Sequence, residues 1–277
     1  MALALGSSVA WGTSDFLAGL QSRRISAIAV MLVSQPVGLV LALAFAIAIG
    51  GDSLGTKEAL LGAGAGAVVV LALGAFYRAM ALGAISVVAM IGALGVLVPV
   101  IAGLVRGERP EPIQVVGAAA AICGVVLVAR EPDPEWRAAG RTALGLAALA
   151  ALGFGVFFVG IDASAGERPA WTIVAARVGG VSALVVIAAL VRPSMRIPGT
   201  IVPILFVIGF CDLLANALFA FATTRGLLSL VAVAGSLYSG VTVLLARVFL
   251  AERLRGVQRA GLGLAIAGVA MIAAGTG

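Results

Sequence analysis

Histidine is absent from the 277 residues of this chain, and cysteine occurs only as Cys123 and Cys211. Both cysteines lie inside apolar runs, where cysteine behaves as a small buried hydrophobe, so we expect neither a disulfide nor a metal site. Without a histidine base, a nucleophile elbow or a suitably placed pair of acids, the sequence offers no catalytic site. It also lacks a Walker A motif, so ATP is not a direct energy source. We therefore predict a protein that is no enzyme and carries no cofactor.

Charged residues are also scarce: they make up 11% of the chain, against about a quarter in typical soluble domains. Hydrophobic residues make up 62%, and the mean hydropathy is +1.20. This composition predicts that lipid is the solvent for most of the chain. The net charge is +6, but the arginines stand singly or in pairs between apolar runs and form no basic face. That distribution excludes nucleic acid as a partner and is typical of charges that flank membrane spans.

The apolar runs are long enough for ten membrane-spanning helices, each of which needs about 20 mostly apolar residues. The longest polar segment, Arg130 to Arg141, separates five runs from five more. We therefore predict a first five-helix repeat over 1–130, a polar linker over 131–141 and a second five-helix repeat over 142–277. The predicted spans are 2–20, 25–49, 58–82, 84–105, 111–129, 142–160, 170–191, 198–222, 228–250 and 256–275.

A stretch near the end of the first half recurs near the end of the second. Shifting Ala102–Val125 by 144 positions places it on Ala246–Val269 with nine identities in 24 positions, and these include a Glu-Arg pair. Charged matches are not expected by chance in a chain with so few charges. Because each half has an odd number of spans, two halves of one fold must cross the membrane in opposite directions. The expected fold class is an all-α integral membrane protein with ten transmembrane helices in two inverted five-helix repeats, and a substrate site near the bilayer midplane.

Further motifs occupy the first span and the tail of each half. They are Trp11-Gly12, then Leu97-Val98-Pro99, Arg106 to Arg109, Gln114, Gly117 and Gly124, and in the second half Ser236-Leu237-Tyr238, Leu250 to Leu254, Gln258, Gly261 and Gly268. This set resembles the drug/metabolite transporter superfamily, specifically its ten-helix EamA-type members. The second half departs in one place, because Ser239 stands where a proline usually follows the tyrosine. This change removes the usual cause of a kink in the ninth span.

The resemblance implies a secondary transporter, often an exporter of amino acids or related small metabolites and amines. It also implies a central cavity lined by the first, third, fourth, sixth, eighth and ninth spans. The expected partners are a small-molecule substrate, with or without coupling to protons, and membrane lipids, in a monomer or homodimer. Abundant alanine, and arginine in place of lysine, are typical of a GC-rich bacterial genome, so we expect a bacterial inner membrane.

Asp212 is the sharpest site candidate, because it lies near the middle of the eighth span with Asn216 one turn away on the same face. An ionisable group there costs about 2.5–3.5 kcal/mol on insertion scales, so it normally faces a cavity or a partner. Asp212 either binds a substrate amine, exchanges a proton, or pairs permanently with an arginine. Arg177, inside the seventh span, is the natural partner; alternatively it holds a substrate carboxylate or snorkels to the interface. If both charges face the cavity unpaired, the expected substrate is a zwitterion such as an amino acid.

Trp11 and Asp15 lie four residues apart and share one face of the first span. Trp11 lies too deep for an interfacial aromatic belt, so we expect it to line the cavity. Asp15 lies nearer the predicted end of the span, where water is close. We expect it to pair with Arg23 or Arg24 at the interface. The alternative is that Asp15 is a gate or rim residue of the cavity.

Hydroxyl and amide side chains within the spans offer neutral hydrogen bonds to a substrate. Tyr77 and Tyr238 are the candidates for lining its path. Serine and threonine also join membrane helices, and we assign them to packing. Gln35, which precedes Pro36 in the second span, is likewise expected to pack.

The turns at Glu108-Arg109 and Glu252-Arg253 lie at span ends, so we assign them a structural role. We expect them to cap the following helix and to set the angle of the hairpin. Two pairs of glycines lie seven residues apart on one helix face, Gly117 with Gly124 and Gly261 with Gly268. We expect them to permit close helix packing, either within the protomer or in a dimer.

Two indicators of membrane orientation conflict. The loops after odd-numbered spans carry twelve arginines, whereas the loops after even-numbered spans carry five basic residues. The positive-inside tendency therefore places the termini outside the cytoplasm. The family resemblance implies that both termini are cytoplasmic, so the orientation stays open.

Two other classes of protein remain open beside the transporter of small metabolites. A lipid-carrier flippase, or a protein that transports lipid headgroups, predicts a lateral opening between spans. A membrane scaffold or sensor predicts that the buried acids and arginine are all paired and leave no cavity. Substrate, direction, coupling ion and oligomeric state do not follow from the sequence.

Overall fold

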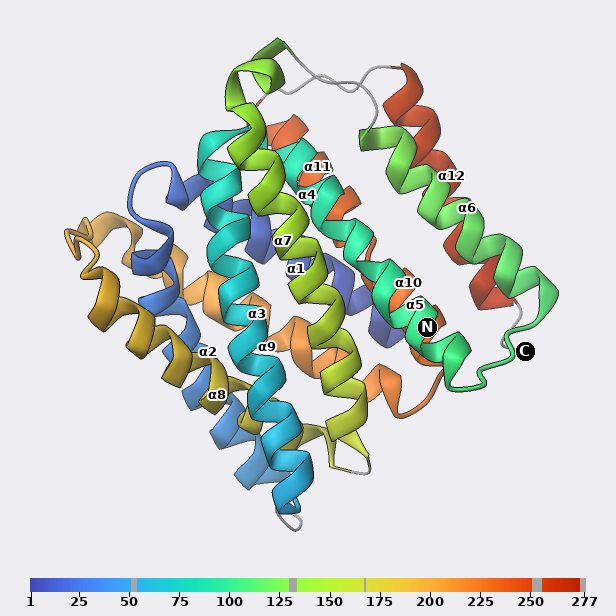
Figure 1. The fold of residues 1–277 in the computed structure, drawn as a ribbon, viewed down its shortest axis with the longest axis horizontal. Helices are drawn as coiled ribbons and strands as arrows, with labels where there is room; N and C mark the ends of the chain where they lie inside the picture. Colours follow the sequence, from blue (N-terminus) through green and yellow to red (C-terminus); the bar gives the residue numbers. More distant parts are fainter. Residues whose placement is uncertain (51–53, 130–133, 167, 251–255, 275–277) are drawn as a thin grey trace.

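The computed structural model describes residues 1–50, 54–129, 134–166, 168–250 and 256–274. Within these segments every regular element is a helix (Figure 1). The elements are, in chain order, α1 (Ala2–Ser22), α2 (Ala27–Ile49), α3 (Thr56–Leu82), α4 (Ile85–Ala93), the 3₁₀ turn η1 (Leu94–Val96), α5 (Leu97–Val105), α6 (Pro112–Ala129), α7 (Pro134–Ala165), α8 (Pro169–Val191), the 3₁₀ turn η2 (Gly199–Ile201), α9 (Val202–Thr223), α10 (Leu228–Gly235), α11 (Tyr238–Leu250) and α12 (Gly256–Ala274).

Each predicted span corresponds to one helix or to a helix that is interrupted near its middle. Seven of the described helical segments are long and apolar enough to cross a membrane, and Pro112–Gly124 is a shorter apolar helix. Large apolar side chains cover the outer surface: Val105, Leu190 and Val40 are 82%, 79% and 66% exposed. Exposed apolar surface of this kind suits contact with lipid, in which helices satisfy their own backbone groups. The chain is therefore an all-helical, multi-pass membrane protein.

Local residues explain where several helices begin and end. Ser26 precedes α2, and its Oγ accepts a hydrogen bond from the Ala29 N–H at 3.1 Å, which satisfies one free donor of the first turn. Gly50 ends the same helix with a φ of 75°, a conformation that favours glycine. α7 begins at Pro134, so the predicted linker 131–141 contains about the first two turns of this helix.

The fourth span is interrupted near its middle. α4 gives way to the 3₁₀ turn η1, which is followed by Pro99 in α5. Proline lacks an N–H, and its ring crowds the carbonyl four residues earlier, here that of Gly95 inside η1. The interruption therefore has a local cause in the sequence.

The ninth span is interrupted as well, between α10 and α11, although Ser239 replaces the usual proline. At this break Ser236 Oγ donates to the Val233 carbonyl at 2.7 Å, and Ser239 Oγ donates to the Ser236 carbonyl at 3.1 Å. Hydroxyl groups that bond backbone carbonyls in this way bend helices. The loss of the proline therefore does not leave the ninth span straight.

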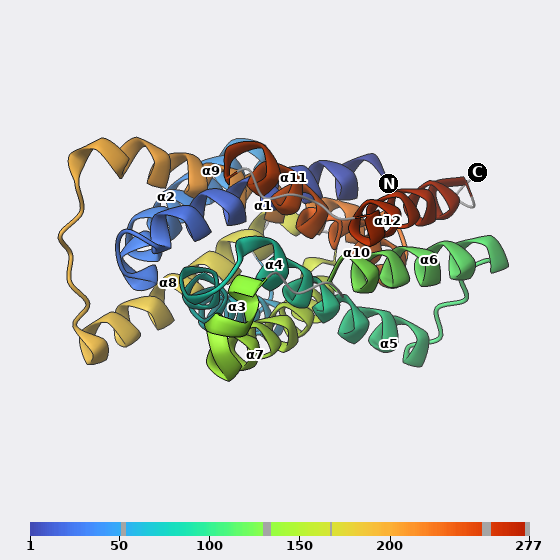
Figure 2. The same ribbon diagram turned by 90° about the horizontal axis from the view of Figure 1, so that it is seen from above.

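Helices from the two halves pack against one another in a reciprocal pattern. α3 packs along α7 and α8, whereas α9 packs along α1 and α2. α2 and α8 also contact each other, and α6 pairs with α12 at one side of the molecule (Figures 1 and 2). Much of the buried core therefore lies between the halves and not inside either of them.

Glycines permit this close approach of helices. A Cβ on Gly66 of α3 would overlap the carbonyl of Ala176 on α8. A Cβ on Gly268 of α12 would overlap the backbone of α6 at Gly117 and Ala121. Gly268 thus serves packing within the chain, which is one of the two roles predicted for the glycines of α6 and α12.

We expect Gly66→Ala to lower the thermal stability of the protein, because the new methyl group would displace the backbone of α8 at Ala176. Overpacking of this kind costs about 1–3 kcal/mol. Gly64→Ala is the matched control, since a Cβ at this position on the same helix meets no atom within 4 Å. Thermal unfolding of both variants in detergent measures the difference. Equal melting temperatures would contradict the close contact between α3 and α8.

Candidate functional site

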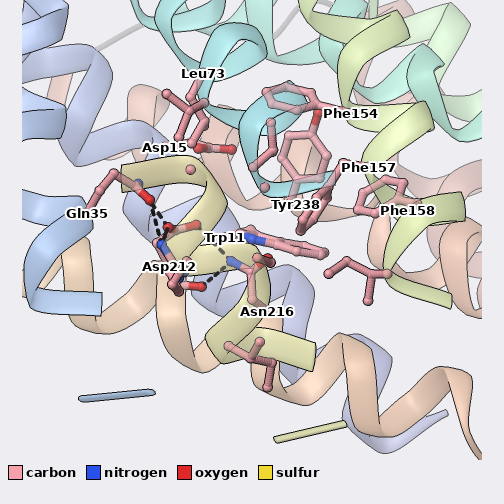
Figure 3. Close-up of a pocket in the computed structure, with 18 residues that line it drawn as sticks. Trp11, Asp15, Gln35, Leu73, Phe154, Phe157, Phe158, Asp212, Asn216 and Tyr238 are labelled. Atoms are coloured by element: carbon pink, nitrogen blue, oxygen red, sulfur yellow. Dashed lines mark hydrogen bonds and ion pairs between the residues drawn. The ribbon is translucent and has the colours of Figure 1, made fainter. Parts of the chain in front are cut away.

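A cavity with about 640 Å³ of empty volume, part of it open to solvent, lies where helices of the two halves meet (Figure 3). The first half contributes α1, α2 and α3 to its lining, and the second half contributes α7, α8, α9 and α11. α2 and α8, the second and seventh spans, lie outside the set of spans that the resemblance implies. The lining residues are Trp11, Asp15, Gln35, Gly66, Val69, Val70, Leu73, Phe154, Phe157, Phe158, Ile161, Ile173, Ala176, Arg177, Gly180, Asp212, Asn216 and Tyr238.

A hydrogen-bonded ion pair forms the polar wall of this cavity. Nη1 of Arg177 on α8 donates to Oδ2 of Asp212 on α9 at 2.7 Å. The same Nη1 donates to Oε1 of Gln35 on α2 at 2.6 Å, and Gln35 Nε2 donates to Asp212 Oδ2 at 3.1 Å. The side chains of Arg177 and Asp212 are only 6% and 7% exposed. The two charges are therefore paired, and the alternative in which both face the cavity unpaired does not apply to this conformation.

Asn216 completes the surroundings of Asp212. It lies one turn further along α9, and its Nδ2 donates to Asp212 Oδ1 at 3.1 Å and to the Asp212 carbonyl at 2.6 Å. Both carboxylate oxygens of Asp212 therefore accept hydrogen bonds from side chains. A buried ion pair is tolerated when its remaining hydrogen-bonding groups are satisfied in this way.

Asp15 lies inside the cavity and not at the membrane interface. Its side chain is buried, with 6% of the residue exposed, and the like charge of Asp212 also acts on it. In the described part of the chain, no hydrogen bond or ion pair reaches its carboxylate. The prediction that it answers Arg23 or Arg24 is wrong, since Arg23 instead donates to the carbonyls at the end of the third span. α1 extends to Ser22, which leaves Asp15 about 10 Å from that end.

Aromatic rings form the wall beside Asp15. Trp11 is 8% exposed and lines the cavity, as the sequence predicts. Its ring centroid lies 5.4 Å from those of Phe158 on α7 and Phe219 on α9, and 6.5 Å from that of Tyr238 on α11. Tilted and edge-on contacts at these distances stabilise aromatic clusters. The cluster is shared between the two halves.

The two tyrosines occupy different positions. The ring of Tyr238 lines the cavity, but its hydroxyl is buried near Gly92 of α4 and has no hydrogen-bond partner among the described residues. Tyr77 is 1% exposed and packs against Phe76 with ring centroids 6.2 Å apart, beside Ser14 of α1. Tyr77 is therefore not among the residues that line the cavity, whereas Tyr238 lines it with its ring.

Glu108 caps a helix, but not the helix that follows it. Its Oε1 accepts a hydrogen bond from the Leu228 N–H at 2.8 Å, and its Oε2 accepts one from the Ser229 N–H at 3.2 Å, at the start of α10 in the second half. The following helix, α6, is capped by Gln114, whose Oε1 accepts from the Glu111 N–H at 2.8 Å. The prediction for Glu108 is wrong because the free N–H groups of α10 attract its carboxylate across the fold.

A second polar contact near this turn also joins the halves. Nη1 of Arg106, just after α5, donates to Oδ2 of Asp162 near the end of α7 at 2.8 Å. Arg109, assigned a structural role in the same turn, is exposed. Glu252 and Arg253, the corresponding pair of the second half, lie outside the described residues.

Gln35 is the cavity residue whose role the sequence-based interpretation missed. It was expected only to pack, but it bridges both members of the ion pair. One signal was present: an amide inside an apolar span is costly unless it finds polar partners. Asp162 offered no comparable signal, because acids are common near helix ends.

An all-helical chain with an apolar outer surface, and with buried charges around a cavity between its halves, has the architecture of a membrane transporter of small molecules. The chain belongs to the EamA-like transporter family, whose family model matches residues 1–130 and 141–274. The resemblance noted in the motifs is therefore confirmed. The protein is a transporter and not an enzyme.

A solved structure described only as "Crystal structure of protein" is similar to this chain. The two are 18% identical, with a TM-score of 0.71, and the comparison covers 96% of this chain and 98% of that chain. A likeness at this level of identity shows the fold alone. No curated protein matches the sequence.

We expect Arg177→Met to destabilise the protein by about 3–5 kcal/mol, because it leaves the buried charge of Asp212 without its partner. Adding Asp212→Leu should recover much of this loss, since the double variant keeps neither charge. Thermal unfolding of the wild type, both single variants and the double variant gives the coupling between the two side chains. Simple addition of the two losses would contradict the view that this pair holds α8 against α9.

Proposed function

We propose that the protein is a secondary transporter that exports small metabolites, amino acids or related amines among them, across a bacterial inner membrane by alternating access. The observation that carries this proposal is the cavity between the halves, with Arg177, Asp212 and Asp15 buried in its wall. Ionisable side chains inside membrane spans are costly, and they usually mark a path for substrate or ions. A packed scaffold would have no need of such a space.

The proposed topology is ten transmembrane helices in two inverted five-helix repeats, over 1–130 and 142–277, joined by the segment 131–141. Three observations support it. The family model matches the chain in two segments. The packing is reciprocal, with α3 against α7 and α8, and α9 against α1 and α2. The fourth and the ninth spans, which correspond in such a repeat, are both interrupted near their middles.

In the proposed mechanism the halves separate at one membrane face at a time. Polar contacts between the halves close the end of the molecule that carries the turn between α5 and α6. Opening toward that end requires these contacts to break, while the interrupted fourth and ninth spans supply points at which helices bend. The contacts are those of Glu108 with the start of α10, of Arg106 with Asp162, and of Ser164 Oγ with the Glu58 carbonyl.

The proposed substrate and proton path runs along the cavity wall. Asp15 and Asp212 are the acids that exchange a proton, and Arg177 responds to the charge of Asp212. Asn216 holds the second oxygen of Asp212. The rings of Trp11 and Tyr238 line the path, and Tyr77 is buried beside Ser14 of α1.

Transport into proteoliposomes tests this proposal. We expect a labelled mixture of amino acids and amines to accumulate when a pH gradient is imposed, and the accumulation to be lost in Asp212→Asn. Glu111→Gln is the matched control, because it removes an exposed acid at the turn before α6, outside the cavity. Accumulation that survives in Asp212→Asn would remove this acid from the mechanism, and flux indifferent to the gradient would indicate a facilitator.

One observation favours a second candidate, a flippase or transporter for polar-headed lipids. An apolar groove with about 1020 Å³ of empty volume lies between α1, α2, α8 and α9. Arg225 is the charged residue among those that line it, and Ile173 lies in the walls of both the groove and the cavity. Translocation of a fluorescent phospholipid in the same liposomes, without flux of amino acids or amines, would favour this candidate.

A further inference from the structure

We infer that the cavity selects organic monocations, amines that carry no carboxylate, and that Asp15 is the residue that binds the ammonium group. This inference rests on the proposed transport function and narrows its substrate class. It follows from the charges of the cavity wall, from the position of Asp15 and from the aromatic rings beside it.

Of the three charged residues that line the cavity, two neutralise each other. Arg177 is joined to Asp212 at 2.7 Å, and its Nη1 is also occupied by Gln35. Its Nη2 is buried without a hydrogen-bond partner among the described residues. Gly38 of α2 packs against the other side of the group, where an added Cβ would lie 3.1 Å from the guanidinium carbon and from Nη1. In this conformation the guanidinium charge is therefore already offset by Asp212, and a substrate carboxylate would have to compete with that partner.

The two amides of the wall are directed at Asp212. Gln35 Nε2 and Asn216 Nδ2 both donate to Asp212. A substrate carboxylate would thus enter a space whose net charge is already negative, because Asp15 has no partner in the segments that the structure describes and the charge of Arg177 is offset by Asp212. Like charges brought together in a buried site disfavour binding strongly.

Asp15, unlike Asp212, has no partner for its carboxylate in the described part of the chain. It is more than nine-tenths buried, it lines the cavity, and no hydrogen bond or ion pair from the described residues satisfies it. The charge that acts on it most is that of Asp212, which has the same sign. In a medium of low dielectric constant such a carboxylate gains far more from a cation than it would in water. An ammonium group supplies both the charge and the hydrogen-bond donors that the site lacks.

The aromatic wall suits the rest of such a molecule. Trp11 lies one turn before Asp15 on α1, and the rings of Trp11, Tyr238 and Phe154 face the same space (Figure 3). Aromatic faces attract cations and also accommodate an apolar body. The cavity therefore presents one acid and several rings to its ligand, which matches a hydrophobic amine better than a zwitterion.

Calorimetric titration of the full chain in detergent tests the inference with matched ligands. Phenethylamine, phenylalanine and 3-phenylpropionate share a phenethyl group and carry an amine, an amine with a carboxylate, and a carboxylate, respectively. Butylamine and norvaline form a second pair that differs only in the carboxylate. At neutral pH we expect each amine to bind about tenfold more tightly, or better, than its amino acid. We expect 3-phenylpropionate not to bind.

Variants of Asp15 test whether this residue binds the ammonium group. We expect Asp15→Asn to weaken amine binding about tenfold or more, Asp15→Glu to retain much of it, and Glu111→Gln to match the wild type. Tighter binding of the amino acids, failure of both amines to bind, or equal binding in Asp15→Asn would overturn the inference. If the inference is overturned in one of these ways, amino-acid flux in proteoliposomes would still support the transport proposal. Amine binding without flux of any ligand would instead reject the transport proposal and keep the binding site.

Discussion

The ion pair between Arg177 and Asp212 is the interaction on which the centre of the molecule depends. Either charge alone would be costly inside a membrane span, and hydrogen bonds from neighbouring side chains make a buried pair tolerable. Gln35 and Asn216 supply such bonds to Nη1 of Arg177 and to both oxygens of Asp212, which ties α2, α8 and α9 together. The polar wall of the cavity is consequently also a structural joint between the two halves.

The cavity is the space that remains once this joint and the close helix contacts are in place. Glycines bring α3 against α8 with backbone nearly touching backbone, so those helices leave little room between them. Bulky rings on α1, α7, α9 and α11 meet instead, and the space opens between them and Asp15. Small side chains thus close the interface between the halves, and large side chains shape the cavity.

The contacts near one end of the molecule are of a different kind. Glu108 binds free N–H groups at the start of α10, and Arg106 binds Asp162. Both contacts join the halves through partly exposed side chains, and charged groups of this kind are easily resolvated when a contact breaks. These contacts therefore break and reform more easily than the buried ion pair. Alternating access requires this combination of contacts that open at the gate and a pair that stays closed in the core.

The sequence by itself determined which segments are helices in lipid, because length and apolar composition are local properties that the bilayer tests span by span. It also singled out Asp212, Arg177 and Trp11, since polar or deeply placed aromatic residues stand out in an apolar run. Only the tertiary structure decided which residues contact one another. Asp15 was assigned to the interface, Gln35 to packing and Glu108 to its own hairpin. Yet Asp15 lies in the cavity between the halves, and Gln35 and Glu108 bind helices far away in the chain. Partners of that kind depend on how the two halves dock, which no local pattern records.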